Sequence, residues 1–207
     1  MKDRDWAERL NVSRTPVREA MRKMQQEGVL KPLAAGGYEV RLISRKELVD
    51  LYRCRAALEA LAAEDAAQHF GPEQQEHLAK ILARGDEAIS KGNADGLYLA
   101  NHEFHQYIVE LSNNIQVKEL LSKLRKMIES YRAALLNEAK SDACKKDEYL
   151  RRLKERQEQH REVLHALSRQ DGEGAALAIG KHIRETAEEI RKMADDQLPE
   201  IEVTNEA

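Results

Sequence analysis

Cysteine, proline and aromatic residues are scarce in this chain of 207 residues. The two cysteines, Cys54 and Cys144, lie far apart in no CxxC pair, so we expect no disulfide framework and a reducing, cytoplasmic setting. Only four prolines and ten glycines interrupt the sequence, and aromatic residues make up 4% of it. Few helix breakers together with 34% charged residues predict a mostly helical protein with solvated charged faces.

Long apolar runs are also missing. No segment approaches the roughly 20 apolar residues that a membrane-spanning helix needs, and the first residues have no signal-peptide pattern. We therefore expect no membrane partner. The length allows one or two domains, each with a core of its own.

The charge is unevenly distributed along the chain. Residues 1–45 contain ten Lys or Arg and six Asp or Glu, whereas the remainder contains 24 basic and 31 acidic residues. A basic head on an acidic body is typical of two domains with different partners, the head facing a polyanion. The charge count alone leaves ordinary surface scatter as an equal alternative.

The pattern of the basic head predicts a helix-turn-helix. The segment "DWAERLN" forms a short helix that ends at Asn11, a residue that tolerates a left-handed backbone. Thr15 is expected as the N-cap of a second helix, with Pro16 in its first turn. Apolar residues then recur at helical spacing, at Val17, Ala20, Met21 and Met24.

Arginines follow one face of this second helix. Arg14, Arg18 and Arg22 are spaced four residues apart and lie away from the apolar stripe. In a helix-turn-helix the second helix enters the major groove, where an arginine fork bonds guanine or phosphate. After Gly28, "VLKPLAAGGYEVRLI" predicts two short strands around Gly36 and Gly37, which would form a wing.

The segments "LNVSRTPVREAMRKMQQEGVL" and "GGYEV" resemble the winged helix of the GntR family of bacterial transcriptional regulators over residues 4–43. The resemblance implies that several head residues contact operator DNA, namely Arg4, Arg14, Thr15, Arg18, Gly36 and Gly37. Such regulators are expected to act as homodimers on a palindromic operator.

One departure from the family concerns the start of the winged helix. Family members have a further helix and a short strand before the point that corresponds to Met1. Three explanations stay open: the native start lies upstream, the DNA-binding unit (residues 1–43) is impaired, or another element covers the gap.

From Ser44 onward the sequence is dominated by helical patterns. Ser44 and Glu47 form a capping box, and polar or glycine-containing breaks separate later helices. An antiparallel bundle over residues 44–197 is expected, followed by a frayed tail at 198–207. The first helix stops at Gly71 and Pro72, and the others are expected at about 72–91, 94–112, 114–139, 145–169 and 172–196.

Histidines are the candidate ligands of this bundle. Asn101 and His105 lie four residues apart on one helix, while His160 and His182 belong to the last two helices. Bundle cores often build metal sites from facing helices, and imidazole suits several transition metals. The scattered positions of these histidines are by themselves weak evidence for a metal site, and surface or satisfied core positions are the more common explanation.

The segments "DLYRCRAALEALAAEDAA", "NHEFHQYIVELSNN" and "QEQHREVLHALSRQDGEGAALAIGKHI" resemble the FCD ligand-binding domain of one GntR subfamily, over about residues 46–195. The resemblance implies a divalent metal, with zinc first and nickel or manganese as alternatives, held by His105, His160 and His182. The family's acidic ligand corresponds to Asn101, which brings no negative charge, so a degenerate site without metal stays open.

A small carboxylate effector is implied at or near the metal. Arg55 and Arg132 are the candidate effector contacts, because an arginine fork clamps a carboxylate. The alternative for Arg55 is a surface ion pair with Glu59, four residues away. Six helices favour the vanillate-regulator type of FCD domain.

Enzyme interpretations fit poorly. "HEFH" spaces its histidines three residues apart, unlike the H-E-x-x-H of zinc proteases, and only Glu162 with His165 gives a Glu-x-x-His element. We therefore expect a DNA-binding regulator controlled by a small organic acid in a metal-containing helical domain, not an enzyme. The alternative is a metal- and ligand-binding sensor whose shortened head no longer binds DNA.

Overall fold

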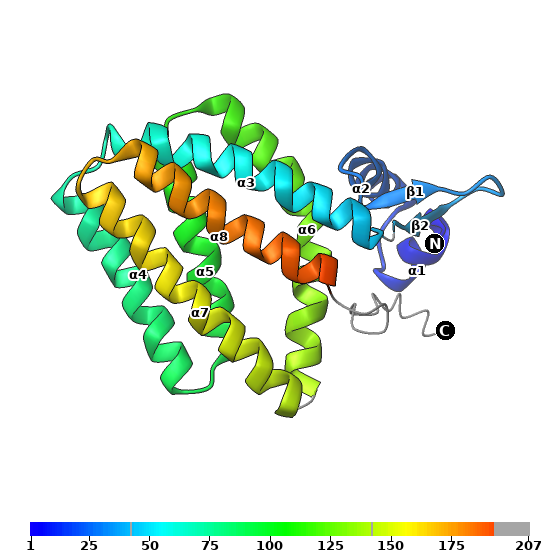
Figure 1. Cartoon of the computed structure of the whole chain (residues 1–207). Coiled ribbons are helices and arrows are strands. Elements are labelled where there is room, and N and C mark those ends of the chain that lie inside the picture. The colour runs from blue at the N-terminus through cyan, green and yellow to red at the C-terminus, as the bar shows by residue number, and fades with distance from the viewer. Residues whose placement is uncertain (42, 142, 193–207) are drawn as a thin grey trace.

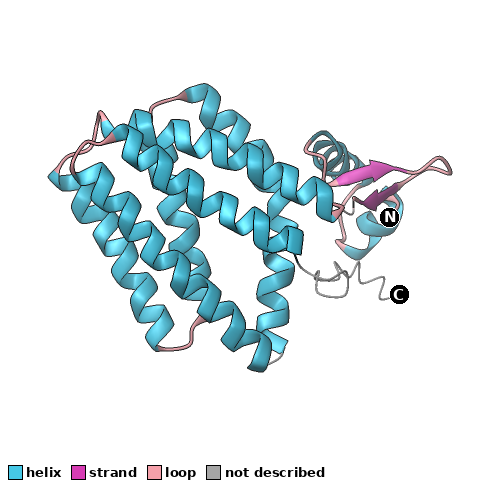
Figure 2. Cartoon of the chain, viewed as in Figure 1, coloured by secondary structure: helices cyan, strands magenta, loops and turns pink. Residues whose placement is uncertain are grey.

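The computed structural model describes residues 1–41, 43–141 and 143–192. Residues 1–41, the head, contain two short helices and a hairpin, and the following helical body is built from six long helices (Figures 1 and 2). The prediction of a mostly α protein, with a winged helix-turn-helix before an antiparallel bundle, is confirmed. The tail at 198–207 and the end of the helix expected over 172–196 lie outside the described residues.

The helix-turn-helix consists of α1 (Asp3–Arg9) and α2 (Arg14–Gln26). Asn11 has the expected left-handed backbone, with φ of 51°. The expected N-cap at Thr15 is wrong, because α2 begins at Arg14 and Ser13 is its N-cap. The earlier start is possible because the N–H groups of the first turn have no acceptor within the helix. Pro16, the third residue of α2, therefore removes no hydrogen bond of the helix.

The hairpin pairs β1 (Leu30–Pro32) with β2 (Tyr38–Val40) in antiparallel register. Gly36 and Gly37 form its tip with φ of 85° and 88°. This left-handed conformation is strained for residues with a side chain but not for glycine. A Cβ on Gly37 would also lie 2.6 Å from the carbonyl oxygen of Met1. Met1 pairs with Tyr38 through two backbone hydrogen bonds of 2.6 and 2.8 Å, which tie the start of the chain to the wing.

The head has a small hydrophobic core of its own. The amphipathic face of α2 supplies Val17 and Met21, which pack with Ala7 and Leu30. Partly buried residues surround them, among them Trp6 of α1. The opposite face of α2 is left exposed, and it carries the arginines.

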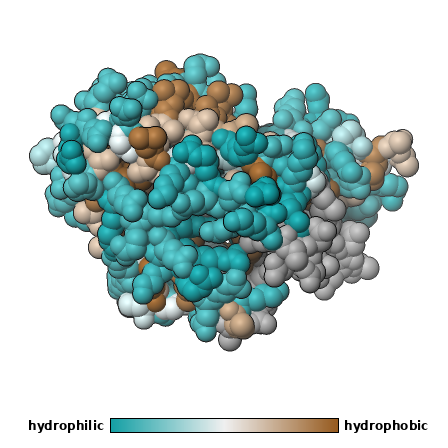
Figure 3. Space-filling model, in the orientation of Figure 1, coloured by the Kyte–Doolittle hydropathy of each residue, from teal (hydrophilic) through white to brown (hydrophobic). Residues whose placement is uncertain are grey.

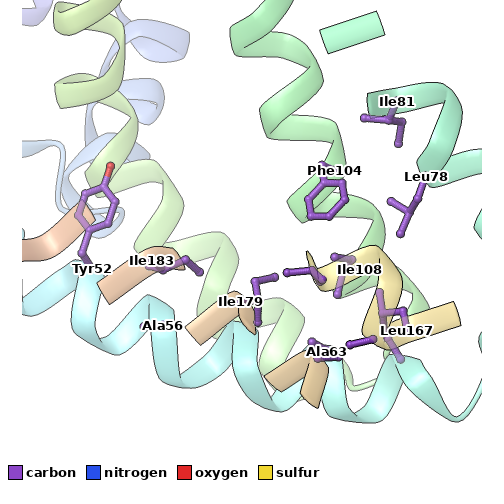
Figure 4. Packing of buried hydrophobic residues seen from close by; sticks show 14 of the residues in the cluster. Tyr52, Ala56, Ala63, Leu78, Ile81, Phe104, Ile108, Leu167, Ile179 and Ile183 are labelled. Carbon is purple, nitrogen blue, oxygen red and sulfur yellow. The ribbon is translucent and has the colours of Figure 1, made fainter. Parts of the chain in front are cut away.

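The helical body is organised around α3 (Arg45–Ala67) and α8 (Gly172–Lys192), which lie side by side in opposite directions (Figure 1). Ser44 caps α3 as expected, since its hydroxyl accepts the N–H of Glu47 at 3.2 Å. Alanines on the buried face of α3 allow α8 to approach closely. Figure 4 shows Ala56 and Ala63 of α3 near Ile183 and Ile179 of α8.

The remaining helices complete the bundle at the expected breaks. Left-handed residues at Gly92, Asn113 and Gln170 separate neighbouring helices. The helices expected over 114–139 and 145–169 approach each other more closely along the chain than expected, because the first ends at Ser141 and the second begins at Ala143. These elements are α4 (Pro72–Ser90), α5 (Ala94–Leu111), α6 (Ile115–Ser141) and α7 (Ala143–Ser168).

The face of the molecule shown in Figure 3 is mostly hydrophilic, with small hydrophobic areas. Ile115 and Leu177 are among the exposed large apolar residues. None of the helices in the described part of the chain combines the length and the apolar character needed to cross a membrane.

Shortening a side chain on the buried face of α8 should affect stability much more than shortening one on its exposed face. Ile179 is 0% exposed, so Ile179→Ala should lower the free energy of unfolding by about 2–5 kcal/mol through lost burial and a new cavity. Leu177 is 62% exposed, and Leu177→Ala should stay within about 0.5 kcal/mol of the wild type. Urea denaturation followed by circular dichroism measures both, and similar values for the two variants would contradict this packing.

Candidate metal and effector site

Three histidines from three different helices meet inside the helical body. His105 comes from α5, His160 from α7 and His182 from α8, and all three are buried. Their Nε2 atoms form a triangle with edges of 3.2, 3.3 and 3.3 Å. The structure thus brings together the histidines that the sequence separates by up to 77 residues.

The far side of two of these rings is held by hydrogen bonds. Nδ1 of His105 lies 2.5 Å from Oε2 of Glu59, and Nδ1 of His182 lies 2.7 Å from Oε1 of Gln159. Both acceptors favour a proton on Nδ1, which leaves the lone pair on Nε2. Nδ1 of His160 has no hydrogen-bond partner among the described residues, and its ring stacks on Phe104 with centroids 4.2 Å apart.

Burial keeps the three imidazoles neutral. It lowers the pKa of His105 to about 4 and holds the pKa values of His160 and His182 well below the ordinary value. Burial alone would raise the pKa of the Glu59 carboxyl, but Arg55 and His105 hold that pKa below its usual range. The site therefore presents three neutral nitrogen donors beside one carboxylate, a set that transition metals bind well.

A pocket of about 280 Å³ opens beside the triangle. His105 and His182 line it together with Asn101, Arg55 and Arg132. The structure therefore gathers both candidate effector contacts and three of the four candidate ligands around one space, and His160 is not among the lining residues. Its other walls include aromatic and aliphatic residues, such as Tyr52, Tyr131, Tyr149, Leu135 and Ile183.

Asn101 is held by an arginine. Its Oδ1 atom accepts a hydrogen bond of 2.9 Å from the guanidinium of Arg132, which also lies over the ring of Tyr98 at 4.8 Å. The side-chain oxygen that a metal would need is thus engaged by Arg132. The structure places Asn101 in the pocket wall, hydrogen-bonded to the guanidinium of Arg132.

Arg55 and Glu59 form the ion pair that their spacing suggested, with Nε and Oε1 2.6 Å apart. The alternative of a surface pair is wrong in its location, because the side chains are only 10% and 0% exposed. The pair is buried because α3 turns this face toward α5 and α8. Arg55 therefore lies inside the molecule with its charge compensated.

The sequence interpretation missed Glu59 and Gln159 as parts of the site. Gln159 precedes His160 directly and gave no signal of its own. Glu59 did carry a signal, because it occupies a position of the buried stripe of α3, three residues after Ala56 and four before Ala63. An acidic residue at such a position needs a buried partner, which marks it for attention.

The head presents its predicted DNA contacts on its surface. Arg4, Arg14, Thr15 and Arg18 are exposed, as is Gly36 at the wing tip, while Gly37 is half-buried. Arg14 forms an ion pair of 3.1 Å with Asp3 across the two helices, and this hydrogen bond lowers the pKa of Asp3. Exposed arginines at the start of α2 are free to exchange such a partner for phosphate or a base edge.

Known proteins match both parts of the chain. The family model described as the FCD domain matches residues 50–185. The Nta operon transcriptional regulator of Aminobacter aminovorans is 32% identical over 202 residues, which cover 97% of this chain and 89% of that protein. The chain belongs to the GntR family of transcriptional regulators with an FCD domain.

Other GntR-type relatives and structures agree. The HTH-type transcriptional repressor RspR of Escherichia coli is 24% identical, covering 95% of this chain and 81% of that protein. The structure of E. coli McbR/YncC superposes with a TM-score of 0.74 at 22% identity, over 92% of this chain and 86% of that one. A GntR regulator structure from Rhodococcus sp. RHA1 gives 0.69 at 20% identity, over 94% and 87%.

GntR membership decides the general function. The head is the DNA-binding part of a transcriptional regulator, and the FCD body is its effector-binding part. The family consists of regulators, so the expectation that the chain is not an enzyme is confirmed by its relatives.

Proposed function

We propose that this regulator holds a divalent metal ion on His105, His160 and His182, and that a small carboxylate effector binds beside it and controls operator binding. The convergence of three buried Nε2 atoms within 3.3 Å of one another carries the proposal. Three neutral nitrogen lone pairs at this distance repel each other unless a cation lies between them.

The dimensions of the triangle favour zinc. Zinc binds imidazole nitrogen at about 2.0–2.1 Å and prefers tetrahedral geometry. Edges of 3.2–3.3 Å would allow the three Nε2 atoms to bind one such ion together. Nickel and manganese, the alternatives, more often bind a larger number of ligands. A zinc ion held by these three histidines would be able to accept one further ligand.

Arg132 supports an anionic occupant of the pocket. It is half-buried, burial lowers its pKa, and no described carboxylate forms an ion pair with it. Arg55 lines the same pocket as a second candidate contact, with its Nε–H bonded to Glu59. An uncompensated guanidinium beside a metal site favours a carboxylate, which it can hold with two hydrogen bonds. We assign Asn101 to holding Arg132 in place for that purpose.

The link to DNA binding runs through the contacts between head and body. Lys126 of α6 pairs with Glu27 at the end of α2, and Arg41 after the wing pairs with Glu47 of α3. The same α6 carries Arg132 into the effector pocket. An effector that binds the two head arrangements unequally shifts the balance between them. A homodimer would present two heads to a palindromic operator.

Operator binding with and without ligands tests this function. The labelled promoter region next to the chain's own gene is titrated with protein by fluorescence anisotropy, in chelator, with zinc, and with zinc plus a panel of small carboxylates. We expect at least one carboxylate to change DNA affinity only in the presence of zinc. Equal affinity under all conditions would contradict control by a metal-bound acid.

Arg132→Gln should weaken carboxylate binding about 10- to 100-fold, because a charge-assisted hydrogen-bonded pair contributes about 1.5–3 kcal/mol. The measurement is the carboxylate-dependent rise in melting temperature of the zinc-loaded protein. Arg84→Gln serves as the control, since Arg84 pairs with Glu103 on the surface and does not line the pocket. A response of the Arg132 variant equal to that of the control would remove Arg132 from the effector site.

A further inference from the structure

Glu59 joins the histidine triangle to the effector pocket. Its carboxylate is fully buried, with 0% of the side chain exposed. One oxygen, Oε2, lies 2.5 Å from Nδ1 of His105, and the other, Oε1, accepts the Nε–H of Arg55 at 2.6 Å. Arg55 and His105 both line the pocket. Each oxygen of one rigid group thus contacts one functional side chain.

We infer that Glu59 is a positioning residue that makes metal binding at His105 and carboxylate binding at Arg55 depend on each other. The inference rests on the proposed metal and effector function. Glu59 is the specific group through which binding of the metal would change the affinity for the carboxylate, and the reverse, although Glu59 contacts neither ligand itself.

The three histidines differ in the hydrogen-bond partner of Nδ1, and the partner of His105, Glu59, is the only charged one among the described residues. His105 has an anionic partner, His182 has the neutral amide of Gln159, and Nδ1 of His160 has no partner among the described residues. A carboxylate on the far nitrogen fixes the tautomer and raises the basicity of Nε2 more than an amide does. His105 is therefore the strongest donor of the three, and Glu59 brings the negative charge that three neutral imidazoles lack.

The direction of the dependence follows from the shared carboxylate. A carboxylate in the pocket that bonds Arg55 competes for its positive charge, so Arg55 draws less electron density from Glu59. Glu59 then polarises His105 more strongly, and the metal is held more tightly. By reciprocity, the metal raises the affinity for the carboxylate by the same factor.

The test uses zinc alone and zinc with excess acetate, on the full chain. Zinc affinity is measured by competition with a chromophoric chelator, with acetate included in the matching blanks. In the wild type, acetate should raise zinc affinity at least about fivefold, the lower range of such couplings. Glu59→Gln should lower zinc affinity about 10- to 100-fold and abolish the acetate effect. Glu64→Gln, the same exchange at an exposed position of α3, should match the wild type in both.

A second variant separates positioning from a general loss of structure. Arg55→Gln leaves the Glu59–His105 contact in place and removes the positive charge that competes for Glu59. Zinc affinity without acetate should therefore rise at least about fivefold, as it does with acetate in the wild type, while the acetate effect should disappear. Glu59→Gln with zinc affinity equal to that of Glu64→Gln would overturn the inference, as would a variant that loses zinc affinity but keeps the acetate effect. Zinc binding by the wild type that acetate leaves unchanged would overturn the coupling while leaving the metal site standing. A wild type that binds no zinc would overturn the proposed metal function together with the inference.

Discussion

Replacing Arg14 and Arg18 together by alanine is expected to lower operator affinity at least about 30-fold, because each arginine that contacts a base or phosphate contributes about 1–3 kcal/mol. Both side chains are exposed at the start of α2, the helix that a helix-turn-helix places in the major groove. Each lost phosphate contact should also reduce the dependence of log affinity on log salt concentration by about one unit.

Fluorescence anisotropy at two salt concentrations, with the promoter region next to the chain's own gene, measures both effects. Lys80→Ala with Arg84→Ala is the matched control, because it removes two positive charges from α4, at the end of the body away from the head (Figure 1). The control should bind DNA like the wild type. Equal losses in both double variants would show that overall charge, and not the face of α2, governs binding.

The second large effect concerns the metal. His160→Gln is expected to lower zinc affinity by more than about 100-fold, since His160 supplies one corner of the triangle and a three-ligand site loses its geometry with any of them. Zinc at a thousand times its dissociation constant stabilises the wild type by about 4 kcal/mol. For a chain of this size that corresponds to a rise in melting temperature of about 8–16 °C.

Thermal melting with zinc and with chelator reports the difference, and metal analysis after gel filtration reports the bound ion directly. His165→Gln is the control, because His165 lies on the same helix but is exposed and outside the triangle. The control should keep the full zinc-dependent rise, and the His160 variant should lose it. A His160 variant that retains one zinc per chain would refute the three-histidine site.

The two experiments together separate the alternatives that the sequence left open. DNA binding that depends on Arg14 and Arg18, with zinc bound in the body, is the result expected of a regulator that senses a metal-bound acid. Zinc binding without any DNA binding by this chain would favour the sensor that no longer reads an operator.

Local patterns accounted for most of the fold. Asn11 and the glycine pair at the wing have the left-handed backbone that their residue types favour, and the helix breaks occur where polar and glycine residues interrupt the periodicity. Such features depend on neighbours within a few residues, so a single sequence contains them. The start of α2 was misplaced because both Ser13 and Thr15 are suitable caps, and local sequence does not choose between them.

Less of the candidate site than of the fold could be predicted from local sequence patterns. The histidines were selected by resemblance to the FCD domain, since their spacing by itself was weak evidence for a metal site. Their convergence depends on how α5, α7 and α8 pack. Glu59 was interpreted as half of a local pair with Arg55, and its second contact, to a residue 46 positions later, has no local signature.

The sequence by itself determined the helices, the wing and the basic head, because helical periodicity, capping and turn chemistry act over a few residues. Only the tertiary structure decided that Arg55 and Glu59 are buried, that the oxygen of Asn101 faces Arg132, and that three imidazoles stay neutral with their Nε2 atoms together. Burial and long-range contacts set the charge and direction of each of these groups, and both arise only when helices distant in sequence pack against one another.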